Sequence, residues 1–443
     1  MNKLLHISII FMSLLLASCG KDEDYVSESE TSFSFTYPTD NSKGYVKVLQ
    51  QHTVGNGFPI IIMADGYLQS DITSGTYHNV VSNAVNALFA VEPMTSLKAY
   101  FDIYEVQAAS EVSGITSTQR NTAFSTYFES TTGVSITTGK KTKIENYAWY
   151  TLKKNYSKFH NALVIMLVNS TRYGGVTQLA ADYSSTDSIP GGFSLAYVPT
   201  GCKVSNVSYF TQVLQHEAIG HGIGKLADEY TEEYDAPSQE VIEQYLNLQK
   251  YGLYINTKYD ADTENPVVEG TLRRTSGGIV TKYVIGGHTM QPGDIGYLFA
   301  CDAGYSNEEL GWIQGGYTYL TPSTTLYTGD NTNYLGWYTT EKNFYRPTWQ
   351  SLMNDVTEQD SKTFNALSRY IIYCRVLKVA QGSPGNIHNE QLQRRFMQFD
   401  TMRSNSSAAK GAAPYARSIK EISTEQTPPA LPAPKLIEKI TLD

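Results

Sequence analysis

Continuous apolar runs, separated by polar turns, mark the middle of the chain. The runs at residues 58–63, 163–168 and 193–198 have the length of buried strands, and residues 99–108, although they include polar positions, also favour a strand. The first run leads into Ala64-Asp65-Gly66-Tyr67, where we interpret Asp65 as a turn-forming residue rather than a catalytic acid. The pattern therefore predicts a sheet of largely buried strands.

Helical periodicity fills the spaces between these runs. Tyr77, Val81, Val85 and Leu88 fall on one face of a helix that we expect to end at Pro93. Further helices are predicted from about 207, over 237–251 and over 362–379. The last of these carries a buried face made of Phe364, Leu367, Ile371, Cys374 and Leu377. Helices layered on a sheet indicate an α/β or α+β fold.

One predicted helix carries a candidate metal site. Residues 216–230 read HEAIGHGIGKLADEY, and imidazole nitrogens are good ligands for zinc. His216 and His221 are five residues apart, so a regular helix would turn the second imidazole about 140° away from the first. A π-type turn around residues 218–220, eased by Gly220, would bring both onto one ion.

The residue types near the histidines suggest hydrolysis. Glu217 follows the first histidine and is the candidate general base and acid, taking a proton from a zinc-bound water and passing it to the leaving amine. Gly222 and Gly224 should stop the helix and turn the chain back beneath the metal, which delivers Asp228 or Glu229 as third ligand. We favour Asp228, and the remaining carboxylate would orient a histidine. The alternative is an amphipathic helix with incidental histidines.

The segment resembles the zinc segment of the IgA-specific metalloendopeptidase family, which is similar to the metzincin peptidases. A glycine three residues after the second histidine, Gly224 here, is shared with metzincins, and residues 345–353 resemble the family's RP-then-SLM stretch. The resemblance implies a metzincin-like zincin domain with a twisted sheet, a zinc-binding helix and a Met-turn at Met353. It also implies that an edge strand pairs with substrate, for which 193–198 is our candidate.

The resemblance has limits at the third ligand. The metzincin spacing would place that ligand at Ala227, which cannot bind metal. A long HExxGH motif also resembles the dipeptidyl-peptidase III family, whose third ligand is a glutamate on a separate helix. That alternative would select Glu240 or Glu243.

The first residues are typical of a bacterial lipoprotein. The chain has a basic start and an apolar stretch over 4–16, followed by the lipobox Leu16-Ala17-Ser18-Cys19. We therefore expect cleavage before Cys19 and lipid attachment to it. The acidic residues 21–24 resemble export signals of some Gram-negative surface lipoproteins. These features imply a Gram-negative cell envelope protein, lipid-anchored to the outer membrane; whether it faces outward stays open, as does an ordinary secretory signal.

These observations divide the chain as follows: 1–18, lipoprotein signal peptide; 19–32, polar tether; 33–54, short N-terminal β segment; 55–380, metallopeptidase domain; 381–443, C-terminal extension, partly loose.

Composition and charge narrow the partners. With 34 basic and 43 acidic residues and no basic cluster, the chain is not expected to bind nucleic acid. Cys202, Cys301 and Cys374 form no metal-binding spacing, and His288 is interpreted as a turn residue. We therefore predict a zinc (Zn2+) endopeptidase acting on extracellular polypeptides or glycoproteins. The alternative is a non-catalytic surface lipoprotein that binds glycans or peptides.

Overall fold

The computed structural model describes most of the chain up to residue 259 and parts of the remainder. The described residues are 46–183, 188–230, 239–259, 351–354, 362–383, 385–403 and 431–437, with short pieces at 284–285, 288–289, 344–345, 356, 440 and 442. All of them belong to one compact unit, Pro38–Asp443. The predictions for Cys19, Cys301 and the imidazole of His288 lie outside what is described.

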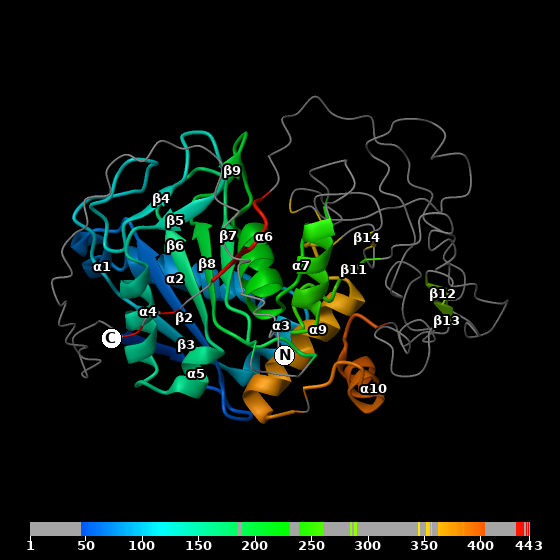
Figure 1. Cartoon of the computed structure of the whole chain (residues 1–443). Helices are drawn as coiled ribbons and strands as arrows, with labels where there is room; N and C mark the ends of the chain where they lie inside the picture. Colours follow the sequence, from blue (N-terminus) through cyan, green and yellow to red (C-terminus); the bar gives the residue numbers. More distant parts are fainter. Residues whose placement is uncertain are drawn as a thin grey trace, which may run out of the picture. The chain divides into compact units, whose positions relative to one another are not determined.

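A mostly parallel sheet forms the centre of the fold (Figure 1). Its order is β1-β3-β2-β6-β8-β7-β15, and β3, β2, β6 and β8 run parallel to one another, whereas β1 and β7 are antiparallel to their inner neighbours. The strands are β1 (Val46–Gln50), β2 (Phe58–Asp65), β3 (Phe101–Val106), β6 (Leu163–Val168), β7 (Val176–Leu179), β8 (Ser194–Pro199) and β15 (Lys435–Leu436). The α/β prediction is thus confirmed at the level of a mixed fold with a parallel core.

The central strands are apolar because helices cover both of their faces. Every residue of β2, β6 and β8 is buried, and alternate side chains contribute to opposite faces. Ile60 and Ile62 belong to the core cluster shared with the site helix, whereas Ile61 and Met63 do not. This two-sided burial explains why these strands appear in the sequence as continuous apolar runs rather than alternating ones.

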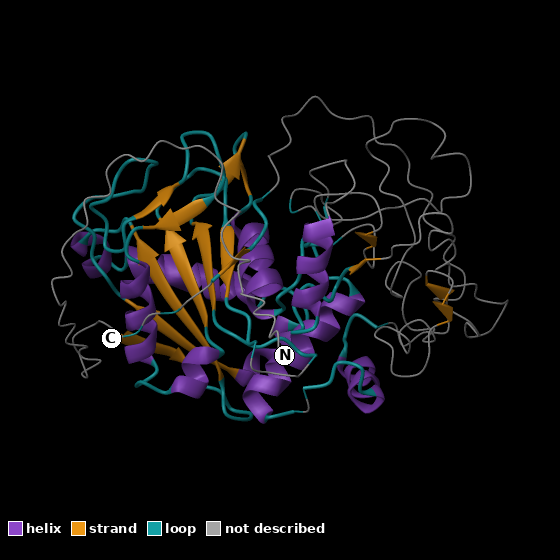
Figure 2. Cartoon of the chain, in the orientation of Figure 1, coloured by secondary structure: helices purple, strands orange, loops and turns teal. Residues whose placement is uncertain are grey.

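Helices are divided between the two faces of the sheet (Figure 2). Helices α4 and α5 contact β3 and β2 respectively, and α2, α9 and the π-helix η3 contact the opposite face. The helices and helical turns are α1 (Gln69–Thr73), α2 (Thr76–Leu88), α3 (Met94–Leu97), η2 (Lys98–Tyr100), α4 (Lys141–Thr151), α5 (Tyr156–His160), α6 (Phe210–Leu214), η3 (Gln215–Ile223), α7 (Gln239–Gln249), α9 (Ala366–Gln381) and α10 (Glu390–Phe399).

Within the part of the chain that the structure describes, four small antiparallel pairs accompany the sheet. They join β4 (Thr126–Phe128) to β5 (Ile136–Thr138), β9 (Lys203–Val204) to β10 (Val207–Ser208), β11 (Lys258–Tyr259) to β14 (Phe344–Tyr345) and β12 (Val284–Ile285) to β13 (His288–Thr289).

Three sequence predictions need correction. Strand β8 is not an edge strand, because β6 and β7 flank it, so the candidate 193–198 cannot accept a substrate strand. The helix expected from about 207 begins at Phe210, since Val207 and Ser208 pair with β9. The first long helix ends at Leu88, before Pro93.

Asp65 ties the carboxyl end of β2 to a distant loop. Its fully buried carboxylate accepts hydrogen bonds from Ser110, Thr122 and Thr126 hydroxyls and from the backbone N–H groups of Gly66, Phe124 and Thr126. With its charge satisfied in this way, Asp65 has a structural role, as the sequence predicted.

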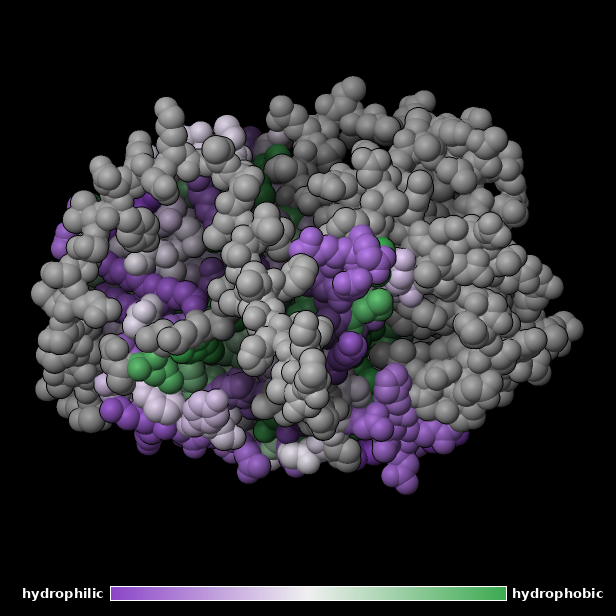
Figure 3. Space-filling view, viewed as in Figure 1, coloured by the Kyte–Doolittle hydropathy of each residue, from purple (hydrophilic) through white to green (hydrophobic). Residues whose placement is uncertain are grey.

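The described surface and cysteines do not point to a particular function. The described atoms on the face in Figure 3 are mainly hydrophilic, with small separate hydrophobic areas. Cys202 and Cys374 are buried free thiols. Within the described ranges, no helix combines the length and apolar character needed to cross a membrane.

Candidate functional site

The two histidines and Glu217 lie on a π-helical stretch. Helix α6 is regular up to Leu214, and η3 then continues with wider turns through Ile223, closed by a 2.8 Å bond from the Gly224 N–H to the Ile219 carbonyl. The predicted π geometry is confirmed, although it extends over 215–223 rather than over one turn. It places the centroids of the His216 and His221 imidazole rings 4.6 Å apart.

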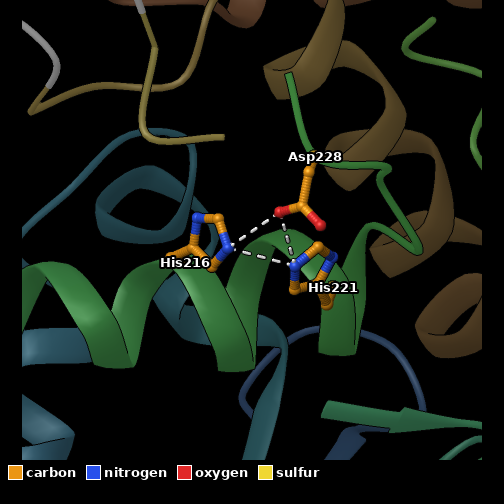
Figure 4. A group of neighbouring side chains, drawn as sticks. All are labelled: His216, His221 and Asp228. Atoms are coloured by element: carbon orange, nitrogen blue, oxygen red, sulfur yellow. Dashed lines mark hydrogen bonds and ion pairs between the residues drawn. The ribbon is translucent and has the colours of Figure 1, made fainter. Parts of the chain in front are cut away.

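Asp228 completes a buried group of three (Figure 4). Its Oδ1 lies 3.1 Å from Nε2 of His216 and 3.2 Å from Nε2 of His221, and the two Nε2 atoms are 3.1 Å apart. All three side chains are almost completely excluded from solvent. Among the described residues, this is the group of His, Cys, Asp and Glu side chains that could hold a metal ion.

The ring nitrogens show what this group would bind. Nδ1 of His216 donates to the Leu352 carbonyl and Nδ1 of His221 donates to the Leu226 carbonyl, each at 2.7 Å. Each neutral ring then presents a lone pair at Nε2, toward the other ring and Asp228. Three lone-pair donors this close together form a group that could hold a metal cation.

The distances fit a tetrahedral metal centre. Zinc–ligand bonds of ~2.0–2.1 Å place neighbouring tetrahedral ligands roughly 3.3 Å apart. The observed separations of 3.1–3.2 Å are close to that edge. Three protein ligands also leave the fourth position open, as a catalytic site requires.

The return of the chain toward the histidines depends on Lys225 and Asn256. Lys225 adopts a left-handed conformation, φ 53°, just after the π-helix, and the Asn256 amide then bonds both the N–H and the carbonyl of Ala227. Gly222 and Gly224 act differently from the sequence prediction: a Cβ at Gly222 would lie 2.7 Å from Leu163, and one at Gly224 would lie 2.9 Å from the Gly220 carbonyl. These glycines permit close packing, while Lys225 makes the turn.

Glu229 faces away from the histidines into a hydrogen-bond network. Its buried carboxylate accepts from the side-chain amides of Asn256 and Asn365 and, at 2.5 Å, from the Ser351 hydroxyl. Its N–H donates to the Met353 carbonyl. Since Leu352 lies between Ser351 and Met353, Glu229 supports the carbonyl that orients His216.

Glu217 stands beside the three-residue group with one oxygen held. The Thr177 hydroxyl lies 2.7 Å from Oε2 and 2.8 Å from the Glu217 carbonyl, and it can donate to one of them at a time. Oε1 is buried without a hydrogen-bond partner among the described protein atoms. Burial raises the pKa of Glu217 to about 8, against the lowering effect of His216 and the Thr177 hydrogen bond.

Glycines bring the backbone and Met353 close to these groups. A Cβ on Gly175 would lie 2.9 Å from Oε1 of Glu217, so the chain before β7 passes directly beside this carboxylate. A Cβ on Gly220 would lie 2.2 Å from Sδ of Met353, which is fully buried beneath the π-helix. Met353 therefore packs directly against the π-helix at Gly220.

The other candidate ligands are elsewhere. Glu240 and Glu243 lie on exposed positions of α7, and the Glu243 carboxylate accepts a hydrogen bond from Gln239. They are not part of the group formed by His216, His221 and Asp228.

Sequence reasoning did not identify the residues that support the site. Thr177, Asn256, Ser351 and Asn365 are all buried and bond Glu217 or Glu229. Thr177, Asn256 and Asn365 come from segments without a recognisable motif, and the stretch that contains Ser351 pointed to Met353 instead, so only the tertiary structure reveals these contacts.

Comparison with known proteins agrees with this geometry. A search among curated proteins found no match. The family model described as IgA Peptidase M64 matches residues 47–244, a range that includes both histidines, Glu217 and Asp228. The match over this region supports an IgA-peptidase-like metallopeptidase family.

Proposed function

We propose that this chain is a zinc-dependent endopeptidase that hydrolyses peptide bonds of extracellular proteins or glycoproteins. The observation that carries the proposal is the meeting of three buried lone-pair donors, on His216, His221 and Asp228, with Glu217 beside them. The glycine-mediated contact between η3 and Met353 supports a metzincin-like arrangement of the same site.

The donor set favours zinc among divalent ions. Two imidazoles and one carboxylate suit Zn2+, whereas magnesium and calcium prefer oxygen ligands. Bound zinc would act as a Lewis acid that polarises the scissile carbonyl and lowers the pKa of water. The protein supplies the fixed ligands, because carbonyls hold both imidazoles in the Nε2-binding tautomer.

Glu217 would accept the proton of the attacking water and later donate it. Its Oε1 is available as a base, and Thr177 holds Oε2 so that the carboxylate keeps one orientation. When Glu217 carries the proton, the Thr177 hydroxyl can donate to the Glu217 carbonyl instead, at 2.8 Å. The same carboxyl group can then protonate the leaving amine.

The decisive experiment is Glu217→Gln, which keeps the shape of the side chain and removes the base. We expect stoichiometric zinc in both proteins by metal analysis, and a fall in kcat/KM of roughly 10²–10⁴-fold on a fluorogenic peptide library. Glu240→Gln, on the exposed face of α7, is the matched control and should leave both values unchanged. A wild-type protein that retains no metal, or an equally active Glu217→Gln protein, would contradict the proposal, the latter result favouring a non-catalytic binding protein.

We also propose that the enzyme is lipid-anchored through Cys19 in a Gram-negative outer membrane. The support is the lipobox at residues 16–19. Cys19→Ser should shift the protein from the membrane to the soluble fraction, and unchanged fractionation would disprove the anchor.

A further inference from the structure

The outer side of β7 passes along the candidate active site. One side of β7 pairs with β8, and the other side is where an additional strand can join the sheet. Thr177, in the middle of β7, holds Glu217, and Gly175 just before the strand lies against the same carboxylate. An extended peptide added to this side of β7 would therefore lie close to the proton-transferring group.

In this structure a segment of the chain itself occupies that side. Residues 431–437, which we call the C-terminal strap, form β15, which pairs in parallel with β7 in the register Lys435↔Gln178 and Leu436↔Leu179. The Ile437 N–H donates to the Leu179 carbonyl at 2.6 Å. In Figure 1 this red segment lies beside β7.

The strap is fixed on both sides of the site. At its start, the buried Leu431 accepts a hydrogen bond at its carbonyl from the Tyr230 hydroxyl, two residues after the metal-group residue Asp228. Farther along, the Lys435 ammonium bonds Glu129 at 2.5 Å and the Ser135 hydroxyl at 3.0 Å, close to the β4–β5 hairpin. Between these anchors the strap runs from the metal-binding segment to β7.

Several features make this strap an occupant that another peptide can displace. Its pairing with β7 is two residues long and parallel, and parallel pairing is slightly less stable per residue than antiparallel pairing. Its Lys435 anchor is exposed, with 41% of the side chain accessible, so this ion pair contributes little. Pro432 and Pro434, which precede β15, have no backbone N–H, so these two positions offer no donors to a further strand.

We propose that the C-terminal strap is an internal competitor for the β7 edge, which a polypeptide substrate must displace to pair there as a strand. This inference rests on the proposed peptidase function. The strap lowers the fraction of molecules that can accept substrate and leaves the metal ligands and Glu217 untouched. Its release should therefore change KM rather than kcat.

The test uses a matched pair at one position. Ile437→Pro removes the N–H that donates to Leu179, whereas Ile437→Val keeps this N–H and most of the buried side chain. For a strap that is closed nine-tenths of the time, release should lower KM about tenfold for a well-cleaved fluorogenic peptide, with kcat and zinc content constant. Ile437→Val should stay near wild type. Tyr230→Phe, which removes the hydroxyl that donates to the Leu431 carbonyl, provides a second variant in case the proline impairs folding.

A binding measurement separates this inference from the proposed function. In a Glu217→Gln background, fluorescein-labelled library peptides should bind more tightly after Ile437→Pro, as measured by anisotropy, whether or not hydrolysis occurs. A synthetic peptide of residues 431–437 should compete for that binding. Folded, zinc-containing Ile437→Pro and Tyr230→Phe proteins with unchanged KM and unchanged peptide affinity would overturn the role of the strap. Equal activity of wild type and Glu217→Gln would instead overturn the peptidase function.

Discussion

Asp228 and Glu229 are adjacent carboxylates whose side chains face different groups. Asp228 meets the two imidazoles, whereas Glu229 holds Ser351 and so the turn that orients His216. We expect Asp228→Ala to abolish stoichiometric zinc binding and Glu229→Gln to weaken zinc affinity by roughly 10–100-fold. Competition with a chelator of known affinity measures both. The reverse ranking would show that Glu229 is the ligand.

Glu217 should make the stability of the metal-free protein depend on pH. Burial raises its pKa from the ordinary 4.5 to about 8, so the folded protein holds it neutral at pH values where the unfolded chain has ionised it. Its contribution to stability is complete below pH 4.5 and is lost as pH rises through about 8. At about 1.4 kcal/mol per pKa unit, the loss is of the order of a few kcal/mol.

The comparison that isolates this effect is wild type against Glu217→Gln, both in chelator. Urea unfolding at several pH values should show wild type losing stability relative to the variant between about pH 5 and pH 8. Parallel curves for the two proteins across this range would show that Glu217 is not buried as a neutral acid.

At the scale of elements, the contact between the π-helix and Met353 has a specific steric requirement. A Cβ at Gly220 would lie 2.2 Å from the Met353 sulfur, so Gly220→Ala must displace Met353. We expect a loss of about 1–3 kcal/mol, measured by denaturation, with weakened zinc retention. Gly139→Ala is the control, since its nearest contact would be an ordinary 3.4 Å. The double variant Gly220→Ala with Met353→Ala should lose less free energy of unfolding than the two single variants lose in sum. Strict additivity of these losses would argue against this contact.

The elements that the sequence predicted well are those with an unambiguous local pattern. Residues 163–168 form β6 with the predicted bounds, because a strand buried on both faces must be apolar throughout. The five-residue histidine spacing likewise led to the π-helix, since no regular helix satisfies it. In both cases a physical requirement is visible within a short stretch of residues.

Other features depend on partners far away in the chain. Helix α10 went unnoticed because it is mainly polar, and Leu392 and Phe396 are its buried apolar side chains. The interior place of β8 depends on β7 returning beside it, which no residue of β8 encodes. Spacing alone could not choose Asp228 over Glu229, because the choice follows from the left-handed Lys225 and the Asn256 clamp.

On the scale of the whole molecule, the C-terminal part of the chain braces the site. Asn365, which caps α9, bonds Glu229, and α9 packs against the π-helix. The fully buried Arg369 of α9 is paired with Asp400, which follows α10, through contacts of 2.9 and 3.2 Å. A buried guanidinium thus links the site-facing helix to α10.

Removing one partner of the Arg369–Asp400 pair should strongly destabilise the fold, because it leaves a buried charge uncompensated. We expect Asp400→Ala to lower the free energy of unfolding by about 3–5 kcal/mol, measured by urea denaturation. Arg394→Ala offers a contrast, since its ion pair with Glu390 within α10 is exposed and should be worth less than about 1 kcal/mol. Similar small losses in both variants would mean that α10 does not brace α9. A large loss confined to Asp400→Ala would show that the peptidase region depends on chain well beyond its zinc segment, because the Arg369–Asp400 link then holds α9 in place beside the site.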